Sequence, residues 1–406
     1  MKQYDYVVVG AGIMGLTTAR ELKARFPESS IVVLDKEPDV ARHSSGRNSG
    51  VLHAGFYYTA DSLKAKFTKE GNQALTQYCE ENQLKINKCG KVVVATNEEE
   101  LRGLYELKKR ANRNGVELRW VDENELLAID PNVKTYQKAL FSPTTSTVDP
   151  VEVCNKLKEE IVASGVTFLF NCPYQEVKGD LVYAGNETIK FGYLVNAAGL
   201  YADKIAHDMG FGLKYTIIPF KGIYLKYAKN KTDVLTNIYP VPNLKNPFLG
   251  VHFTKTVDGA IKIGPTAIPA FWRENYTGFK NFKLGEFMSI AGYQSKLFFT
   301  NAFGFRSLAF EEARKYIKSY FINLSLKMVK NIDKEGFGDF LKPGVRAQLL
   351  NKQTMELVQD FIIEGDDRSM HILNAVSPAF TCSFPFSRHV VDTICSKQGG
   401  QKIEAS

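Results

Sequence analysis

The stretch "YDYVVVGAGIMGLTTARELKARF", residues 4–26, decides the fold of this chain. Its apolar run Tyr6–Val9 is typical of a parallel strand that is buried on both faces. Gly10, Gly12 and Gly15 follow with GxGxxG spacing, and a helical pattern of apolar residues begins at Met14. A strand, a glycine turn and a helix therefore come in the order that a dinucleotide-binding unit requires.

Each glycine of this turn has a separate task in such a unit. Gly10 permits the tight turn, Gly12 lets the backbone approach a pyrophosphate, and Gly15 lets the helix pack close to the strand. The N-terminus of the helix then offers N–H groups and a partial positive charge to the phosphates. A second strand, "SIVVLDKE", ends near Asp35, twenty residues after Gly15, where a carboxylate can bind a ribose.

Composition and charge set the class of protein. With 406 residues, 44% apolar and 24% charged, the chain is expected to form two joined globular domains. Its net charge of +8 favours an anionic substrate or membrane surface, and no sequence signature of a nucleic-acid-binding protein accompanies that charge. The six dispersed cysteines are typical of reduced thiols, and the first strand leaves no room for a signal peptide. No apolar run of about 18 residues occurs, so we expect a cytoplasmic protein, with peripheral membrane contact left open.

The segment after the second strand points to the cofactor. A glycine- and serine-rich stretch, "RHSSGRNSGVLHAGFYY" at 42–58, stands where a nicotinamide dehydrogenase would continue with a helix and a strand. Together, GxGxxG, "LDKE" and this stretch resemble the FAD-containing oxidoreductases of the D-amino acid oxidase superfamily, in which this segment wraps the flavin pyrophosphate and reaches the ring. The strand and turn "FGYLVNAAGLYADKIAHDMG" at 191–210 resemble the second flavin-contact motif of that superfamily.

A series of longer sequence segments narrows the resemblance to one family. "RNSGVLHAGFYY", "CGKVVVA", "NIYPVP", "PFLGVHFT", "AFWRENY", "PGVRAQ" and "NAVSPA" occur in this order over nearly the whole chain. They resemble the L-2-hydroxyglutarate dehydrogenase/oxidase family. The chain departs from that family at "SPAFTCSFPFSRHVV", where Phe380, Phe384 and Phe386 stand in place of smaller residues.

This resemblance implies an α/β fold of the D-amino acid oxidase and glycine oxidase type. A Rossmann-like FAD-binding domain is joined to a discontinuous substrate domain with an antiparallel sheet. The expected FAD-binding domain comprises residues 1–85, 145–212 and 337–406, and the expected substrate domain comprises residues 86–144 and 213–336.

The resemblance also implies the reaction. FAD would oxidise L-2-hydroxyglutarate to 2-oxoglutarate by hydride transfer to flavin N5, and the electrons would pass to oxygen or a quinone. A base that titrates near neutrality must take the hydroxyl proton, which makes His53 and His252 the catalytic candidates. The substrate carboxylates need cationic or hydroxyl donors. The candidates for this binding are Arg47, Tyr57, Tyr58, Lys221, Tyr239, Arg273 and Arg346.

The residues expected to contact FAD lie in the motifs above and in the later strands and turns, and no metal ligand is expected. They are Gly10, Gly12, Ile13, Met14, Gly15, Asp35, Lys36, Arg42, His43, Ser44, Ser45, Arg47, Asn48, Ser49, Gly50, Val51, Val177, Ala198, Gly199, Gly344, Arg346, Ser377, Pro378 and Thr381.

Two other functions stay open at this point. The N-terminal half of the flavin signature is shared with oxidases of amines, amino acids and glycerol 3-phosphate. A flavin-binding protein without turnover is a third reading, of a different class. In the main reading the partners are a small hydroxy acid and an electron acceptor, which is oxygen, a quinone or an electron-transfer protein, and nucleic acid is not among them.

Overall fold

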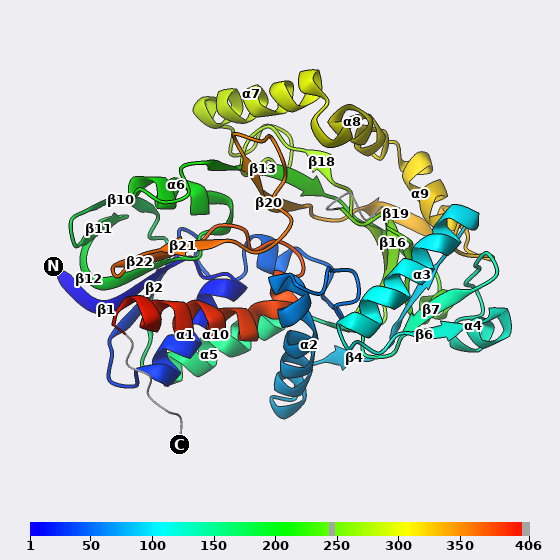
Figure 1. Cartoon of the computed structure of the whole chain (residues 1–406), viewed down its shortest axis with the longest axis horizontal. Helices are drawn as coiled ribbons and strands as arrows, with labels where there is room; N and C mark the ends of the chain where they lie inside the picture. The colour runs from blue at the N-terminus through cyan, green and yellow to red at the C-terminus, as the bar shows by residue number, and fades with distance from the viewer. Residues whose placement is uncertain (243–247, 400–406) are drawn as a thin grey trace. The chain divides into compact units, whose positions relative to one another are not determined.

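The chain forms two compact units, each built from separated segments (Figure 1). The computed structural model describes residues 1–242 and 248–399. The first unit comprises residues 1–47, 150–218 and 347–406, and the second comprises residues 48–149 and 219–346. Residues 48–85, 145–149 and 337–346, expected in the FAD-binding domain, thus belong to the second compact unit, and residues 213–218 belong to the first. The assignment of the segments to a cofactor and a substrate domain stays a prediction.

An eight-stranded sheet forms the centre of the first unit. Its main order is β10-β11-β12-β1-β2-β9, and β22, which also pairs with β21, joins it at β12. The central β1 (Lys2–Val9) runs parallel to both β12 (Glu187–Asn196) and β2 (Ile31–Leu34). The other strands are β9 (Thr167–Leu169), β10 (Tyr174–Lys178), β11 (Leu181–Ala184), β21 (Ile363–Gly365) and β22 (Ser369–Ile372). This parallel centre is the dinucleotide-binding arrangement that the sequence predicts.

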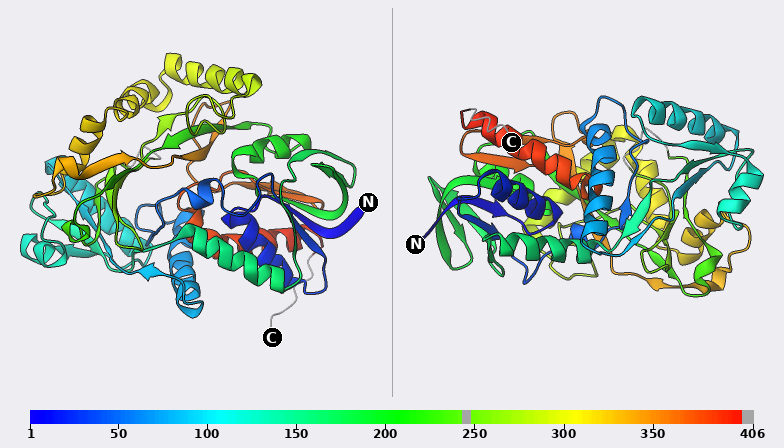
Figure 2. Two further views of the ribbon diagram at one scale, coloured as in Figure 1. Left: turned by 180° about the vertical axis from the view of Figure 1, so that it is seen from behind. Right: turned by 90° about the horizontal axis from the view of Figure 1, so that it is seen from below.

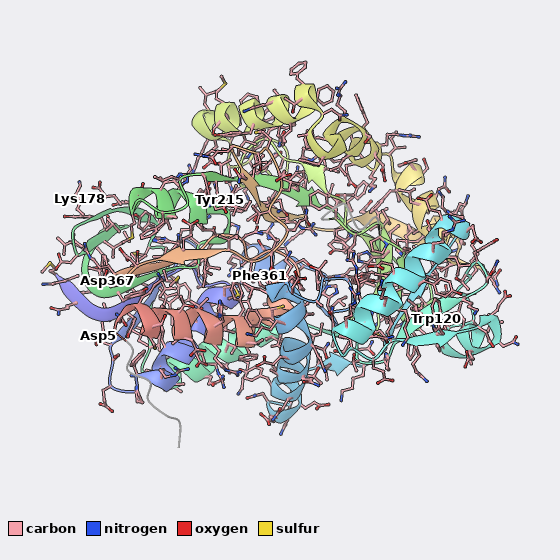
Figure 3. The ribbon with its side chains drawn as sticks, in the orientation of Figure 1. Asp5, Trp120, Lys178, Tyr215, Phe361 and Asp367 are labelled. Atoms are coloured by element: carbon pink, nitrogen blue, oxygen red, sulfur yellow. The ribbon has the colours of Figure 1, made fainter. Side chains whose placement is uncertain are left out.

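Three helices of the first unit lie side by side, as Figure 2 shows. Helix α1 (Ile13–Arg25) contacts both α5 (Pro150–Ala163) and α10 (Ala379–Lys397), and α6 (Ala202–Asp208) follows β12. The hydroxyls of α1 meet Ser387 of α10, with 2.6 Å between the Thr17 and Ser387 oxygens. The bulky Phe386 is buried and stacks on Phe361, labelled in Figure 3, with ring centroids 4.4 Å apart. This bulky C-terminal residue therefore fills the core of the first unit.

The second unit is centred on a mixed eight-stranded sheet. Its order is β19-β14-β17-β16-β15-β5-β7-β6, and most neighbours are antiparallel, as expected for this part of the chain. The strands are β5 (Lys91–Val94), β6 (Arg119–Val121), β7 (Ala139–Ser142), β14 (Leu225–Tyr227), β15 (Asn237–Pro240), β16 (His252–Lys255), β17 (Ile261–Gly264) and β19 (Phe337–Phe340). A small sheet, β3-β8-β4, brings residues 48–85 into this unit through β3 (Val51–Leu52), β8 (Ser146–Val148) and β4 (Ile86–Asn87). β13 (Tyr215–Gly222) and β20 (Gly344–Asn351) each cross a unit boundary, and β13 pairs with β18 (Ile268–Pro269).

Two apolar clusters cover opposite faces of this larger sheet. On one face α3 (Glu98–Arg113) packs its Leu104 and Leu107 against Val93 of β5. On the other face Val92 of β5 joins a core that includes residues of α4 (Glu123–Ile129) and α9 (Lys318–Leu326). Alternate residues of β5 thus face alternate sides, as the geometry of a strand requires. The unit's other helices are α2 (Leu63–Glu81), α7 (Leu284–Thr300) and α8 (Phe305–Arg314).

The sequence also makes local predictions in this unit: Asn97 with Glu100 has the spacing of a capping box at a helix start, and turns between antiparallel strands are expected at 242–247 and at Asp258–Gly259. Asn97 caps α3 by accepting a hydrogen bond from the Glu100 N–H at 2.9 Å. The predicted turn at Asp258–Gly259 joins antiparallel β16 and β17. The predicted turn at 242–247 lies, apart from its first residue, outside the described residues. Within the described part of the chain, no helix is both long and apolar enough to cross a bilayer.

The close packing of Gly15 leads to a stability prediction. A Cβ at Gly15 would lie 1.7 Å from the Gly10 carbonyl oxygen, so Gly15→Ala must push the helix from the strand. We expect a loss of about 2 kcal/mol or more in the free energy of unfolding. A Cβ at Gly292, inside α7, would meet no described atom within 4 Å, so Gly292→Ala should add up to about 1 kcal/mol. Urea unfolding of both variants tests this, and equal stabilities would contradict it.

Candidate active site

The N-terminus of α1 is shaped for a phosphate-bearing ligand. Gly12 is the N-cap, and it supplies no side chain to cover the first N–H groups. The Ser45 hydroxyl accepts a hydrogen bond from the Ile13 N–H at 2.9 Å, which brings the 42–47 segment to this end of the helix. A Cβ at Gly12 would lie 3.0 Å from that hydroxyl. The first-turn N–H groups and the lack of side chains fit the pyrophosphate of FAD.

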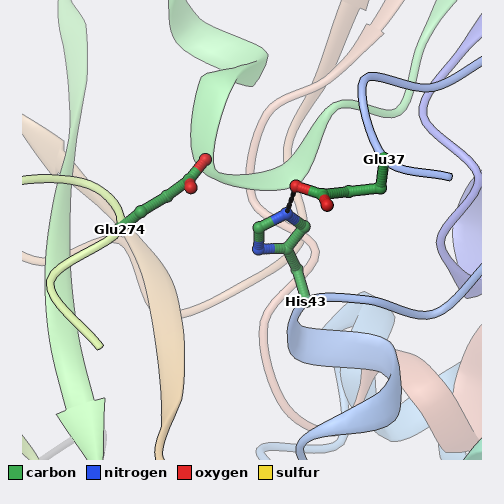
Figure 4. Close-up of side chains that lie close together, drawn as sticks. All are labelled: Glu37, His43 and Glu274. Carbon is green, nitrogen blue, oxygen red and sulfur yellow. Dashed lines mark hydrogen bonds and ion pairs between the residues drawn. The ribbon is translucent and has the colours of Figure 1, made fainter. Parts of the chain in front are cut away.

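Asp35 and Glu37 organise the backbone beside this turn. Asp35 accepts hydrogen bonds from the N–H groups of Ala11 at 2.6 Å and Glu37 at 2.9 Å. In Figure 4 the ring of His43 meets the carboxylate of Glu37, with 2.8 Å between Nε2 and Oε1. Lys36 also pairs with Glu37 at 2.7 Å. Although burial raises it, these two partners lower the pKa of Glu37, so His43 is held beside the cofactor turn by a charged group.

The other residues predicted to bind FAD in the first unit lie at strand ends and helix starts. Met14 is in the first turn of α1, Ser44 begins a 3-10 turn, and the Arg47 Nε donates to the Arg42 carbonyl at 2.9 Å. Ala198 and Gly199 follow β12, and a Cβ at Gly199 would meet open space. The remainder are Val177 on β10, and Ser377, Pro378 and Thr381 at the start of α10.

Six predicted FAD residues belong to the second unit. They are Asn48, Ser49, Gly50, Val51, Gly344 and Arg346. The Asn48 side chain accepts a hydrogen bond from the Gly50 N–H at 2.8 Å, and this bond closes a tight turn. Gly50 has a positive φ of 76°, which glycine adopts readily. The FAD contacts of these residues stay predictions.

The face of the large sheet that carries α3 also gathers polar side chains. Lys91 and Val93 share this face of β5, and Val93 is paired with Tyr239 of β15. The pairing of Ile238 with Phe253 sets Tyr239 opposite His252 on the antiparallel β16. The rings of Tyr239 and His252 stack with centroids 3.7 Å apart and an angle of 18°. Three neighbouring strands thus bring Lys91, Tyr239 and His252 together.

His53 completes the group from the segment after β3. Its Nδ1 lies 3.4 Å from the Nζ of Lys91. Burial lowers the pKa of His53 well below its ordinary value, and the nearby charges of Lys91, His252 and Arg346 lower it further. We call His53, Lys91, His252 and Arg346 the cationic cluster.

Lys91 is the most unusual member of the cationic cluster. Its side chain has no exposed surface, and burial lowers its pKa from 10.5 to about 7. Its Nζ lies over three aromatic rings, 4.2 Å from the centroid of Tyr239, 5.3 Å from Tyr57 and 5.5 Å from Phe56. Such a cage stabilises an ammonium group through the ring faces without a counter-ion.

His252 has a defined tautomer. Its Nδ1 lies 2.8 Å from the Gly250 carbonyl, which can only accept, so Nδ1 carries the proton. Burial lowers the pKa of His252 to about 3, and Lys91, Lys262 and Arg346 contribute to this shift. His252 is therefore neutral, with Nε2 as a hydrogen-bond acceptor.

Hydroxyl groups without partners adjoin the cationic cluster. The side-chain oxygens of Tyr57, Tyr239 and Thr254 are buried and make no hydrogen bond of normal geometry within the described residues. Buried polar atoms in folded proteins almost always have a partner, so such a group of donors indicates a ligand site. The groups found to lower the pKa values of His53 and His252 are all basic side chains, and Glu312 acts on Arg346. The site therefore fits an anion.

The predicted substrate residues fall into two groups. Tyr57 and Tyr239 adjoin Lys91, and Tyr239 also stacks on His252. Arg346 acts on the pKa values of His53 and His252, and Tyr58 acts on the pKa of Arg346. The contacts found for the other three residues involve groups outside the cationic cluster. Lys221 lies on β13. The Arg273 backbone N–H donates a hydrogen bond to Glu286 at 3.1 Å, and the Arg47 Nε donates one to the Arg42 carbonyl. All these roles stay predictions.

Lys91 is the member of the cluster that sequence reasoning missed. Its signal was a charged residue at the start of an otherwise apolar strand, within "CGKVVVA".

The burial of Lys91 leads to a pH-dependent stability prediction. The pKa is about 7 in the folded chain and 10.5 in the unfolded chain, so unfolding takes up a proton between these values. The stability of the wild type should therefore rise with pH across this window. Lys91→Met removes the effect, so we expect the variant to be more stable at pH 7 by on the order of 4 kcal/mol, with the difference shrinking toward pH 10.5. Urea unfolding over this range measures it.

The matched control is Lys226→Met, which removes an exposed lysine of β14. Its stability should follow that of the wild type at every pH. A stability difference for Lys91→Met that does not change with pH would contradict the prediction.

Comparisons with known proteins show the family and the fold of the chain. The family model "FAD dependent oxidoreductase" (DAO) matches residues 5–359. The fold resembles FAD-bound L-alpha-glycerophosphate oxidase from Mycoplasma pneumoniae, with a TM-score of 0.74, 22% identity and coverage of 97% of this chain and 95% of that one. It also resembles glycine oxidase from Geobacillus kaustophilus, with a TM-score of 0.71, 15% identity and coverage of 99% and 96%. These structures confirm the expected fold class.

Sequence relatives are similar over nearly their whole length. The mitochondrial L-2-hydroxyglutarate dehydrogenase of Nematostella vectensis is 35% identical, over 96% of this chain and 90% of the relative. The L-2-hydroxyglutarate dehydrogenase of Escherichia coli K12 is 32% identical, over 96% and 93%. The human mitochondrial relative is 34% identical, over 96% and 88%. The chain is thus an FAD-dependent oxidoreductase of the DAO family, and within it the chain belongs to the L-2-hydroxyglutarate dehydrogenases.

Proposed function

We propose that this enzyme oxidises L-2-hydroxyglutarate to 2-oxoglutarate. The names of the relatives support the substrate, and the cationic cluster supports its chemical class. L-2-Hydroxyglutarate carries two carboxylates and one hydroxyl. It therefore needs cations and hydroxyl donors for its ends and a base for its centre.

The observation that carries the proposal is the set of buried basic side chains and hydroxyl donors around His53 and His252. Lys91 and Arg346 act on both histidines, no carboxylate is found among the described groups that shift the pKa values of these histidines, and Glu312 acts on Arg346. Like charges that are buried together destabilise one another unless an anion enters. A dicarboxylate would relieve this repulsion, and the hydroxyls of Tyr57 and Tyr239 would gain the acceptor that they lack among the described residues.

The first unit holds most of the residues proposed to bind the cofactor. The N–H groups of the first turn of α1 and the segment around Ser45 would hold the pyrophosphate, and Asp35 would adjoin the ribose. Bound FAD supplies the acceptor for the hydride of the substrate carbon.

The residues of the cationic cluster have distinct proposed tasks. Arg346 is a permanent cation whose guanidinium lies 4.9 Å from the ring centroid of Phe248, and this stacking orients it for a carboxylate. His252, fixed with its proton on Nδ1, accepts a hydrogen bond at Nε2 and orients the substrate. His53 takes the hydroxyl proton as the base.

Anaerobic spectroscopy of the holoenzyme tests this proposal. L-2-Hydroxyglutarate should bleach the absorbance of bound FAD, whereas D-2-hydroxyglutarate should not, because anchoring both carboxylates presents the C–H bond of only one enantiomer correctly. Addition of oxygen or of a quinone afterwards shows which acceptor restores the colour.

Other outcomes of this experiment would replace the proposal. Bleaching by glycerol 3-phosphate or an amino acid, with none by L-2-hydroxyglutarate, would identify a sibling oxidase. A flavin spectrum that no hydroxy acid, amine or glycerol 3-phosphate changes would indicate a flavin-binding protein without turnover.

The electron acceptor and the membrane form the second part of the proposal. Leu284, Met288 and Phe299 recur on one side of α7 and are exposed, although Ile290 and Leu297 on its other side are buried. Phe279 and Phe299 are 85% and 80% exposed, which is unusual for aromatic side chains. We call the exposed apolar residues of segment 279–317 the α7–α9 surface: Phe279, Phe282, Leu284, Met288, Phe299, Phe303, Phe310, Tyr316 and Ile317.

The charges around the α7–α9 surface favour an anionic lipid bilayer as its partner. Exposed basic residues accompany it, namely Lys280, Lys283, Lys296, Arg306, Arg314 and Lys318. Glu311 is the single exposed acidic residue of segment 277–318, all of which is described. Apolar side chains among basic ones are typical of proteins that lie on anionic membranes. We therefore propose a cytoplasmic enzyme whose α7–α9 surface contacts a membrane, where a quinone would be the acceptor.

Sedimentation with vesicles tests the membrane contact. The holoenzyme should bind phosphatidylcholine vesicles that contain phosphatidylglycerol more tightly than vesicles of phosphatidylcholine alone. The double variant Phe279→Ser, Phe299→Ser should bind at least ~10-fold more weakly, because two aromatic rings no longer enter the lipid.

The control is Leu213→Ser, which removes an exposed apolar residue of the first unit and should leave vesicle binding unchanged. Equal binding to both kinds of vesicle, or an unaffected double variant, would exclude this contact.

A further inference from the structure

Lys91 and His53 form a buried pair of nitrogen bases that can exchange a proton. Their nitrogens, Nζ and Nδ1, lie 3.4 Å apart inside the second unit, and both side chains are buried. Within the described residues no carboxylate accompanies the amine, which lies instead over the rings of Phe56, Tyr57 and Tyr239. A lysine that only balanced a charge would be paired with an acidic group.

The protonation state of Lys91 decides which nitrogen of His53 carries a proton. A charged Lys91 can only donate, so neutral His53 would accept at Nδ1 and keep its proton on Nε2. A neutral Lys91 can accept, so His53 can donate from Nδ1 and leave Nε2 without a proton. Only the second state gives His53 a basic Nε2 that can receive a proton from a substrate hydroxyl.

We propose that Lys91 is a positioning residue that sets the tautomer of His53 and receives the proton that His53 takes from the substrate. This inference rests on the proposed function, because it assumes a hydroxyl substrate in the cationic cluster. It makes His53 and Lys91 a two-step proton relay.

The relay balances as follows for a 2-hydroxy acid. The C–H bond breaks and its hydrogen leaves with the electron pair as a hydride, for which bound FAD would be the acceptor, while the O–H bond breaks and its proton binds Nε2 of His53. The Nδ1–H bond of His53 then breaks, and that proton forms a new bond with Nζ of Lys91. The C–O bond becomes a carbonyl, His53 ends neutral with its proton on Nε2, and Lys91 ends as an ammonium.

The relay removes the main weakness of His53 as a base. Burial lowers its pKa well below its usual value, and the nearby basic side chains lower it further, so His53 alone holds a proton poorly. Lys91 has the higher affinity for a proton, with a pKa of about 7, so the transfer runs from the weaker base to the stronger one. The faces of the aromatic rings stabilise the ammonium that results.

The same comparison favours His53 over His252 as the base. The Nδ1 proton of His252 goes to the Gly250 carbonyl, which cannot accept a proton in a relay. His252 therefore cannot pass a proton on through Nδ1, and its proposed role is to accept a hydrogen bond at Nε2.

The groups that face Lys91 limit what else can titrate there. Cys89 precedes it on the same segment and raises its pKa, and Tyr57 and Tyr239 adjoin it with pKa values raised well above 10 by burial. His53 and His252 face it with lowered pKa values, and Arg346 acts on both histidines. Near neutral pH, Lys91 is the group of this set that changes its charge.

Two substitutions separate the relay from simple binding of an anion. Lys91→Met keeps the length of the side chain without an amine, and Lys91→Arg keeps a positive charge that cannot accept a proton. In stopped-flow experiments with saturating L-2-hydroxyglutarate, we expect both variants to reduce FAD at least ~10²-fold more slowly than the wild type. The rise of the wild-type rate with pH through the titration of Lys91 should disappear in both. Both variants should keep the substrate affinity, because the carboxylates are proposed to bind at Arg346 and not at Lys91.

The control is Lys255→Met, which removes another buried lysine of the same sheet, one that donates to the Lys231 carbonyl. It should keep the wild-type rate and pH profile. A Lys91→Arg variant that reduces FAD as fast as the wild type would overturn the relay and make Lys91 an anion-binding residue. A wild-type pH profile in Lys91→Met would overturn it as well.

A second measurement does not depend on turnover. In the resting holoenzyme with ¹⁵N-labelled histidine, the His53 signals, assigned with His53→Gln, should show the proton on Nε2 below the titration of Lys91. They should show it on Nδ1 above that titration, and no switch should occur in Lys91→Met. A His53 tautomer that stays the same across this pH range in the wild type would overturn the inference, even if the variants lost FAD.

The two measurements distinguish the failure of this inference from that of the proposed function. A wild type that L-2-hydroxyglutarate does not reduce would end the proposed function, while the ¹⁵N titration still tests the coupling of Lys91 to His53. A wild type that is reduced but shows no tautomer switch would end only the relay.

Discussion

The register of β5 against β15 is the constraint on which the second unit depends. Val92 and Val94 fill the core on one face of the sheet, so Lys91 and Val93 must face the other side. A slip by one residue would bury the ammonium among apolar side chains and turn two valines toward the polar site. The packing of the core therefore fixes the place of Lys91. The pairing of β15 with β16 then places Tyr239 opposite His252.

Backbone contact plays the corresponding part in the first unit. Gly15 lies so close to the Gly10 carbonyl that any side chain would separate α1 from β1. The same approach leaves the first N–H groups of α1 at the end of the parallel strands, and the Asp35 carboxylate holds the Ala11 N–H in place. In the first unit the proposed cofactor site depends on the absence of side chains at the glycine turn. In the second unit the proposed substrate site depends on which face of the large sheet the side chains occupy.

The sequence predicted what local spacing determines, and it missed what distant pairing creates. The glycine turn, its strands and helix, the cap of α3 and the hairpin at Asp258–Gly259 each follow from residues close together in the chain. Lys91 begins a strand, a position where a lysine is usually exposed, and only the meeting of three strands with the His53 segment buries it.

A site of buried basic side chains costs stability, and that cost constrains how a dianion can bind. A carboxylate placed against Lys91 would raise the pKa of its amine and hold it charged, which would leave His53 in the tautomer that cannot act as a base. Burial lowers the pKa of Arg346, but a guanidinium keeps its charge at neutral pH, so an anchor at Arg346 does not change the state of the relay. The rings of Phe56, Tyr57 and Tyr239 occupy the space around the Lys91 amine and stabilise its charge only after a proton arrives. The aromatic cage therefore keeps the carboxylates of the substrate away from the one amine that must be neutral when the reaction begins.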